Sequence, residues 1–289
     1  MKTKLELFVE KLIKSKPENL NFGDYDNGTI HLNFSGGKDS VALSLIMLYG
    51  YKIPRHKLQL VHMRIDGKKS NKSFFDYPET DQYLEYAANK LGLPLTIISG
   101  ELGLKERIKE RGKFPSSTTQ FCTSYGKRDV YSKWVRGQGP GNYLCVTGER
   151  AEESWRRRNR PIFEVYKPAT APTKNRFVYS FRPIHHLFEE EVWELMRLAD
   201  IEPHPCYTEY KVSRCSCKFC IFLSPEEMKR NAEAFPEQFN ELIEMEKSLN
   251  HTMKFEKGEQ ISLSDFIKKE RRKKPDQMKL DLFTPPCAL

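Results

Sequence analysis

A glycine-containing segment that follows a largely apolar run constrains the fold of this chain most strongly. Residues 30–34 read IHLNF, residues 35–40 read SGGKDS, and an apolar run resumes over residues 41–48. This order predicts a strand, a tight loop and a helix. The two glycines let the loop backbone approach a ligand closely, and the start of a helix favours an anion. The segment therefore predicts a phosphate-binding loop; a plain glycine turn is the alternative.

Strand and helix patterns continue to alternate after this unit. Helices are expected over residues 5–12, 38–48 and 80–91, and strands over residues 30–34, 58–65, 95–99 and 143–147. Strands separated by helices indicate an α/β fold with a parallel twisted sheet and flanking helices, as in Rossmann-like proteins. Because ligands bind beyond the carboxyl ends of such strands, we expect Ser35, Asp66 and Gly148 to meet in one crevice.

The pattern changes along the chain and predicts four segments. Residues 1–27 form an N-terminal helical segment, residues 28–200 the nucleotide-binding domain, residues 201–265 a Cys-rich loop and helical region, and residues 266–289 a basic tail. We expect the tail to be disordered, because its charges cannot form a core.

Composition bears on the cellular compartment. No apolar run approaches the ~20 residues of a membrane-spanning helix, and the N-terminus lacks the apolar core of a signal peptide. We therefore expect a cytoplasmic protein with no membrane partner. Seven cysteines in that compartment favour metal binding or sulfur chemistry over disulfides. Cys145, in the middle of a predicted strand, is expected in the core.

Several motifs together resemble one family. The SGGKDS segment is similar to the PP-loop of the N-type ATP pyrophosphatases. Further segments resemble motifs of the phosphoadenosine phosphosulfate (PAPS) reductases: residues 66–67 (DG), 77–80 (YPET), 121–128 (FCTSYGKR), 147–157 (TGERAEESWRR) and 213–222 (SRCSCKFCIF). Residues 183–184 (PI) and 191–193 (EVW) resemble a further family motif, from which Glu191 departs by standing in place of Asp and Leu187 by standing where Trp is usual. The resemblance covers about residues 28–223 and implies an adenine nucleotide alpha-hydrolase-like fold.

The resemblance implies that ATP is split between its α and β phosphates and that AMP is transferred to a substrate. Backbone donors and cations suit the negative charge that builds up in this reaction. The residues implied to bind ATP are Ser35, Gly36, Gly37, Lys38, Asp39, Ser40, Asp66 and Gly148. Those implied to act in catalysis are Lys38, Asp39, Arg150, Arg156 and Arg157. Asp39 would hold Mg²⁺, or would cap the helix instead.

The same resemblance implies contacts to the second substrate. The residues concerned are Glu79, Thr80, Lys127, Arg128, Glu152 and Ser154. Ordinary roles in a turn or at a helix N-terminus remain open for Asp66 and Glu79.

Cysteine spacing indicates a metal centre. Cys217 and Cys220 form a C-x-x-C pair, and Cys122 lies about 95 residues upstream. Thiolates of this kind suit a [4Fe–4S] cluster or Zn²⁺. Cys215 or Cys206 would be the fourth ligand; a cluster held by three cysteines would instead leave one iron open to carry sulfide. Buried cysteines without a metal are the alternative, more so for Cys122 than for the C-x-x-C pair.

Basic blocks and a C-terminal motif point to partners. Residues 156–160 (RRRNR) and 268–274 (KKERRKK) can neutralise nucleic-acid phosphates, or they can form a solvated helix face and a flexible tail. The tail residues Gln277, Leu280, Leu282 and Phe283 resemble the peptide that bacterial proteins insert into the sliding clamp. A tail docking on its own domain is the alternative that we favour.

Together these features predict a PP-loop ATP pyrophosphatase that supports iron–sulfur-dependent sulfur transfer to nucleic acid. The chain most resembles the ATP pyrophosphatase component of bacterial DNA phosphorothioation systems, which implies DNA as substrate and a cysteine desulfurase or other sulfur donor. Three alternatives remain: a reductase of adenylylated sulfate, a tRNA thiolation enzyme, and a nucleotide-binding defence module without turnover. The E-C-G-[LI]-H nucleophile of the assimilatory reductases is missing from the sequence, which weighs against the first.

Overall fold

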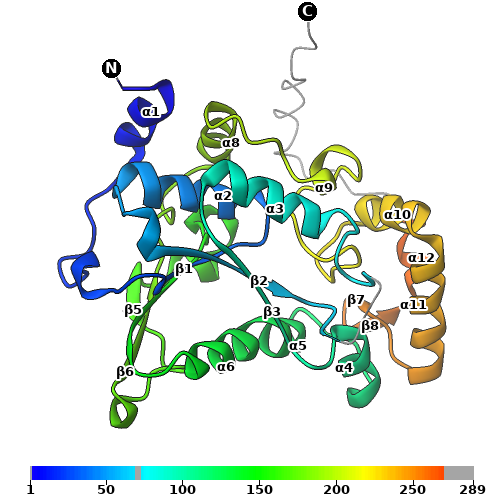
Figure 1. Ribbon diagram of the computed structural model, residues 1–289. Helices are drawn as coiled ribbons and strands as arrows, with labels where there is room; N and C mark the ends of the chain where they lie inside the picture. Colours follow the sequence, from blue (N-terminus) through cyan, green and yellow to red (C-terminus); the bar gives the residue numbers. More distant parts are fainter. Residues whose placement is uncertain (1, 69–72, 270–289) are drawn as a thin grey trace, which may run out of the picture.

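A six-stranded, mostly parallel sheet organises the computed structural model, which describes residues 2–68 and 73–269 (Figure 1). The strand order is β3-β2-β1-β4-β6-β5, and only β5 runs antiparallel to its neighbour. The strands are β1 (Ile30–Asn33), β2 (Leu58–Arg64), β3 (Leu95–Ser99), β4 (Gly141–Val146), β5 (Phe163–Val165) and β6 (Arg176–Phe181). The predicted α/β fold with a parallel sheet is confirmed.

Helices cover both faces of this sheet. The helices before residue 150 are α1 (Lys4–Leu12), α2 (Lys38–Leu45), α3 (Thr80–Leu91), α4 (Leu104–Arg111), α5 (Phe121–Thr123) and α6 (Asp129–Gly137). Later come α7 (Trp155–Arg158), α8 (Glu189–Leu198), α9 (Pro205–Thr208), α10 (Pro225–Ala234), α11 (Pro236–Leu249) and α12 (Leu263–Phe266). Helices α2, α3 and α8 lie over one face and α6 over the other (Figure 1). None of the helices described combines the length and apolar character needed to cross a membrane.

Two apolar cores hold these layers together. Ile30, Leu32 and Leu60 on the sheet pack in one core with Leu43 of α2 and Leu84 of α3. The opposite face of the sheet packs against α6 in a second core. Cys145 of β4 belongs to this second core, and its exposed fraction is 2%. Burial of apolar surface on both faces explains why the strands are nearly continuous apolar runs. The predicted core position of Cys145 is confirmed.

The predicted elements agree closely with those observed. Helix α3 and strand β3 have the predicted bounds, and β1, β2 and β4 differ by one or two residues at their ends. The helix expected over residues 38–48 changes character, because α2 ends at Leu45 and a π-helical turn, Ile46–Gly50, follows. Gly50 at the end of this turn lies close to the tip of the Ile13 side chain.

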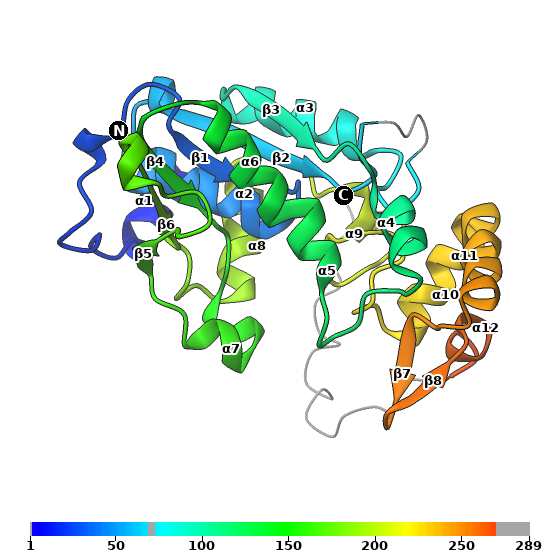
Figure 2. The ribbon, with the colours of Figure 1, turned by 90° about the horizontal axis from the view of Figure 1, so that it is seen from below.

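The C-terminal region forms a separate apolar cluster beside the sheet. Helices α10 and α11, the hairpin β7 (Lys254–Glu256) and β8 (Glu259–Ile261), and α12 gather at one end of the molecule (Figures 1 and 2). Their cluster includes Phe75, Phe114 and Phe121 from loops and helices of the preceding domain. The boundary placed at residue 200 stays a prediction. The tail motif of Gln277, Leu280, Leu282 and Phe283 lies outside the described residues.

Asp66 organises the loop after β2. Its buried carboxylate accepts backbone hydrogen bonds from Phe74, Phe75 and Asp76 at 2.8–3.0 Å. Burial, with Asp76 close by, raises the pKa of Asp66 to about 6. Asp66 therefore has the structural role in a turn that the sequence analysis left open, since its carboxylate binds the backbone of its own loop.

We expect Asp66→Ala to lower the free energy of unfolding by about 2–4 kcal/mol, because three backbone N–H groups lose their acceptor. Since the pKa of Asp66 is higher in the folded than in the unfolded state, wild type gains stability as the pH falls from 7 to 5. The difference between wild type and variant should therefore grow by on the order of 1 kcal/mol over this interval. Urea unfolding at both pH values measures it.

Asp81→Ala is the matched control, because Asp81 is exposed on α3 and its ion pair is with Arg64; its effect should stay within about 1 kcal/mol. An Asp66→Ala variant as stable as this control would contradict the proposed role of the Asp66 carboxylate.

Candidate active-site cleft

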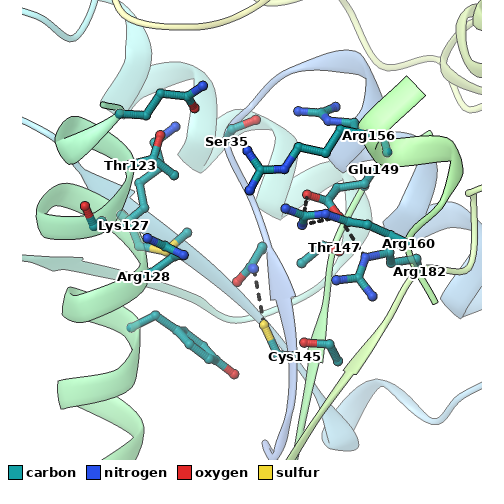
Figure 3. A pocket seen from close by; sticks show the side chains of 18 of the residues that line it. Ser35, Thr123, Lys127, Arg128, Cys145, Thr147, Glu149, Arg156, Arg160 and Arg182 are labelled. Atoms are coloured by element: carbon teal, nitrogen blue, oxygen red, sulfur yellow. Dashed lines mark hydrogen bonds and ion pairs between the residues drawn. The ribbon is translucent and has the colours of Figure 1, made fainter. Parts of the chain in front are cut away.

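A cleft of about 1080 Å³ opens beyond the carboxyl ends of β1, β4 and β6. Its wall combines the loop before α2, the segment from residue 118 to 131, the segment from residue 147 to 168, and Tyr207, Arg214 and Cys215. Figure 3 shows side chains from these elements pointing into the cleft from two sides. Many residues that the sequence singled out line it: Ser35, Gly37, Asp39, Ser40, Lys127, Arg128, Gly148, Arg156, Arg157 and Cys215.

The loop before α2 has the conformation of a phosphate cradle. Gly36 adopts a φ of +77°, a backbone conformation that favours glycine. No side-chain hydrogen bond caps the start of α2, and the acid of its first turn, Asp39, is paired with Arg150, so the positive end of the helix stays available to an anion. Ser40 donates from its hydroxyl to the carbonyl of Gly37 at 2.7 Å, which holds the turn closed.

A buried ion pair ties this loop to the end of β4. Nε of Arg150 donates to Oδ1 of Asp39 at 2.5 Å, and Arg150 also pairs with Glu152. A Cβ on Gly148 would lie 2.8 Å from the carbonyl oxygen of Asp39, so only glycine allows the two segments to approach this closely. Asp39 therefore does not cap its helix. Its Oδ1 is engaged by Arg150, and its Oδ2 lies 3.7 Å from Nζ of Lys38.

Lys38 does not line the cleft. Its side chain is buried, its Nζ lies 3.3 Å from a carboxylate oxygen of Glu189, and the ammonium group sits over the rings of Trp193 and Tyr207. The hydroxyl of Tyr207 accepts from the backbone N–H of Lys38 at 3.2 Å. In this conformation Lys38 joins the loop to α8 and α9, and its predicted contact with ATP stays a prediction.

Sequence reasoning missed a second set of charges on the cleft floor. Glu149 accepts from Nε of Arg182 at 2.7 Å and from Nη1 of Arg160 at 2.8 Å (Figure 3). Burial raises the pKa of Glu149, but the pairs with Arg182 and Arg160 outweigh burial and lower the pKa overall. Their positions in the sequence could have indicated this pair. Glu149 follows β4 and Arg182 follows β6, and residues that follow strands of a parallel sheet commonly bind ligands.

Positive charge dominates the lining. Nine arginines and lysines face four aspartates and glutamates around the cleft. Lys127 and Arg128 lie on one side in Figure 3, with Arg156, Arg160 and Arg182 on the other. Within the part of the chain that the structure describes, Arg156 and Arg128 have no carboxylate partner. Such a surface favours a ligand with several negative charges.

Other predicted residues lie near the cleft without lining it. Glu79 accepts from the hydroxyl of Tyr210 at 2.9 Å, and the hydroxyl of Thr80 lies 3.3 Å from Nε2 of His204. Ser154 caps α7 by accepting from the backbone N–H of Arg157. The predicted residues outside the lining are Gly36, Lys38, Asp66, Glu79, Thr80, Arg150, Glu152, Ser154, Cys122, Cys206, Cys217 and Cys220.

The cysteines gather on the side of the cleft nearest the C-terminal region. Cys122, Cys215, Cys217 and Cys220 pack against the same apolar cluster, and the six described cysteines are all free. Burial raises the pKa of Cys122, and the nearby thiol of Cys220 adds to this effect. Cys215 touches the glycine loop, because a Cβ on Gly37 would lie 2.9 Å from its Cβ.

A group that could hold a metal ion combines two of these cysteines with a histidine. The ligand atoms of His204, Cys206 and Cys215 lie within 4.8 Å of one another. His204 also has structural partners, since Nδ1 accepts from the backbone N–H of Cys206 at 3.0 Å. The sequence proposed Cys206 and Cys215 as alternative fourth ligands but did not predict that they lie together. Their juxtaposition depends on the turn of α9, which brings residues 204–207 back to the glycine loop.

Comparison with known proteins identifies the family. The model of the phosphoadenosine phosphosulfate reductase domain matches residues 29–213, which include the whole six-stranded sheet and the cleft lining except Arg214 and Cys215. The chain belongs to this family. A 37.8 kDa protein of Escherichia phage 186 is 27% identical over 140 residues, a match covering 47% of this chain and 40% of the phage protein. The chain thus spans less than half of that relative's length.

Solved structures with similar folds come from several enzymes. The U34-tRNA thiolase NcsA of Methanococcus maripaludis, solved with its [4Fe–4S] cluster, is 14% identical with a TM-score of 0.46; the match covers 86% of this chain and 79% of that one. PAPS reductase of Candida auris is 14% identical with a TM-score of 0.41, over 62% and 77% of the two chains. The family model confirms the predicted family, and the phosphorothioation subtype stays a prediction.

Proposed function

We propose that this protein is an ATP pyrophosphatase that adenylylates a nucleic acid in a sulfur-transfer reaction, and that this nucleic acid is DNA. The observation that carries the proposal is the glycine loop facing a cleft lined by nine cations. Family membership supports binding of an adenine nucleotide. A nucleic-acid backbone supplies the second polyanion that a cleft of this charge and size can hold beside ATP.

The residues of the cleft suit attack on the α phosphate. The N-terminus of α2 and the hydroxyl of Ser35 would hold the phosphate chain, while Ser40 would keep the turn closed through its bond to Gly37. Arg156 and Arg157 would stabilise the negative charge on the departing pyrophosphate. Preorganised donors of this kind act without reorganisation at the moment of reaction, which makes them effective.

Asp39 is the residue that would hold Mg²⁺. Its carboxylate lines the cleft at the start of α2, and Oδ2 has no hydrogen-bond donor among the described residues. Bound there, the ion would supply charge neutralisation between phosphate oxygens. Arg150 would keep the carboxylate oriented through its bond to Oδ1.

The free cysteines fit a [4Fe–4S] cluster by their donor chemistry. Cys122, Cys217 and Cys220 would hold it, with Cys215 or Cys206 as a fourth ligand, and Zn²⁺ is the alternative metal. If Cys122, Cys217 and Cys220 alone held the cluster, its fourth iron would keep an open coordination position and would supply a binding site for sulfide. Cys215 lies beside the glycine loop, with Sγ 3.8 Å from the carbonyl oxygen of Ser35, so the cysteine region adjoins the proposed ATP site. We propose a cysteine desulfurase or similar protein as sulfur donor.

We expect Arg156→Ala to reduce pyrophosphate release from ATP by about 100-fold, because a cation at the developing charge is lost. Release is measured in the presence of Mg²⁺ and single-stranded DNA, and thermal melting checks that the variant is folded. Arg197→Ala is the matched control, since Arg197 is exposed on α8, pairs with Glu194 and does not line the cleft. Equal rates in the two variants would contradict the placement of ATP in this cleft.

We expect protein purified without oxygen to contain iron and acid-labile sulfide and to absorb broadly near ~400 nm. Cys122→Ala, Cys217→Ala and Cys220→Ala should each lose most of the iron, because each removes a ligand. Cys145→Ala should retain it, since Cys145 lies in the core of the sheet. Stoichiometric zinc without iron would refute the cluster, and the proposed ATP site would stand.

A further inference from the structure

Trp155 is exposed at the rim of the cleft. Its exposed fraction is 77%, higher than that of any other large apolar side chain in the described residues. It opens the short helix α7, and the next residue, Arg156, lines the cleft. At this exposure the indole offers a flat apolar face on which a ligand at the cleft can stack.

The backbone around Trp155 is held in place. Ser154 caps α7 through a bond from the N–H of Arg157 at 3.2 Å, and the side-chain amide of Asn159 donates to the carbonyl of Trp155 at 2.9 Å. Arg157 is further tied to Glu153 by an ion pair. The exposed ring therefore sits on an ordered helix and requires little ordering when a ligand binds.

The surroundings of Trp155 are strongly basic. Arg156 and Arg158 follow it on α7, both are exposed, and neither has a carboxylate partner within residues 2–68 and 73–269. In Figure 2, α7 and α5 lie on opposite sides of the region where residues of both segments line the cleft. An aromatic ring among unpaired guanidinium groups matches a ligand that alternates flat rings with phosphates.

We propose that Trp155 stacks on an unpaired base of a single-stranded nucleic acid whose neighbouring phosphate lies on Arg156. This inference rests on the proposed function, which supplies a nucleic acid as the ligand. It adds that the bound form is single-stranded. A duplex keeps its bases stacked on each other, so its bases cannot reach the indole without unpairing. A base next to the reacting phosphate, held by the indole, would fix the backbone in register with the glycine loop.

Charge argues for a polynucleotide over a protein at this surface. Ile162 and Val165 are also exposed, at 46% each, and Val165 lines the cleft together with three arginines of the same segment, Arg156, Arg157 and Arg160. A protein partner would have to supply carboxylates for Arg156 and Arg158 and an apolar pocket for Trp155. A single strand supplies phosphate and base at each nucleotide.

The test measures binding of a fluorescein-labelled ten-nucleotide DNA by anisotropy, without ATP and at fixed salt. Base–aromatic stacking contributes about 1–3 kcal/mol, so Trp155→Ala should weaken binding about tenfold or more. Trp155→Phe keeps a stacking surface and should stay within about threefold of wild type. Phe255→Ala is the control, because Phe255 is exposed on β7 and does not line the cleft.

Intrinsic fluorescence supplies a second readout that a merely structural role would not change. Unlabelled single strand should quench the tryptophan emission of wild type, and Trp155→Phe should lose this quenching while it still binds. Equal affinity of wild type and Trp155→Ala, or equal quenching by duplex and single strand, would overturn the proposal. Because no ATP is present, failure of pyrophosphate release would leave this result interpretable, and the two proposals can fail separately.

Discussion

The ion pair between Arg150 and Asp39 is the interaction on which the geometry of the cleft depends. It joins the segment after β4 to the first turn of α2, and both partners are largely shielded from water. Removing one partner of a buried pair costs about 3–5 kcal/mol, because the other charge is left uncompensated. Gly148 permits this approach, since a side chain there would collide with the carbonyl of Asp39. The position of the glycine loop is thus determined by a residue more than one hundred positions away.

A second set of contacts joins the same loop to the cysteine-containing region. Tyr207 accepts from the N–H of Lys38 and from that of Cys215, both at 3.2 Å, so one hydroxyl bridges the loop and the cysteine segment. Lys38 completes this connection through Glu189. The glycine loop therefore lies between β4 on one side and the cysteines on the other. This arrangement supports a reaction in which nucleotide chemistry and sulfur chemistry occur in one place.

Local patterns predicted much of the fold, and tertiary contacts decided the parts they missed. The strand–loop–helix unit at residues 30–45 and the bounds of α3 follow from periodicity and glycine placement. Sequence could not show that the carboxylate of Asp66 is used by its own loop, because those donors come from residues 74–76. Nor could it show that Lys38 turns toward Glu189, or that Glu149 joins Arg182, since each pair spans a long stretch of chain. The sequence thus predicted the elements that carry these residues, but it did not predict the direction in which each side chain points.

We propose that ATP is cleaved in this cleft between its α and β phosphates. The most direct measurement uses ATP labelled at the α and γ phosphates, incubated with Mg²⁺ and single-stranded DNA, with the products separated by chromatography. The account predicts that the α label appears in AMP or on the DNA and that the γ label appears in pyrophosphate. Release of the γ label as phosphate, with the α label in ADP, would contradict it.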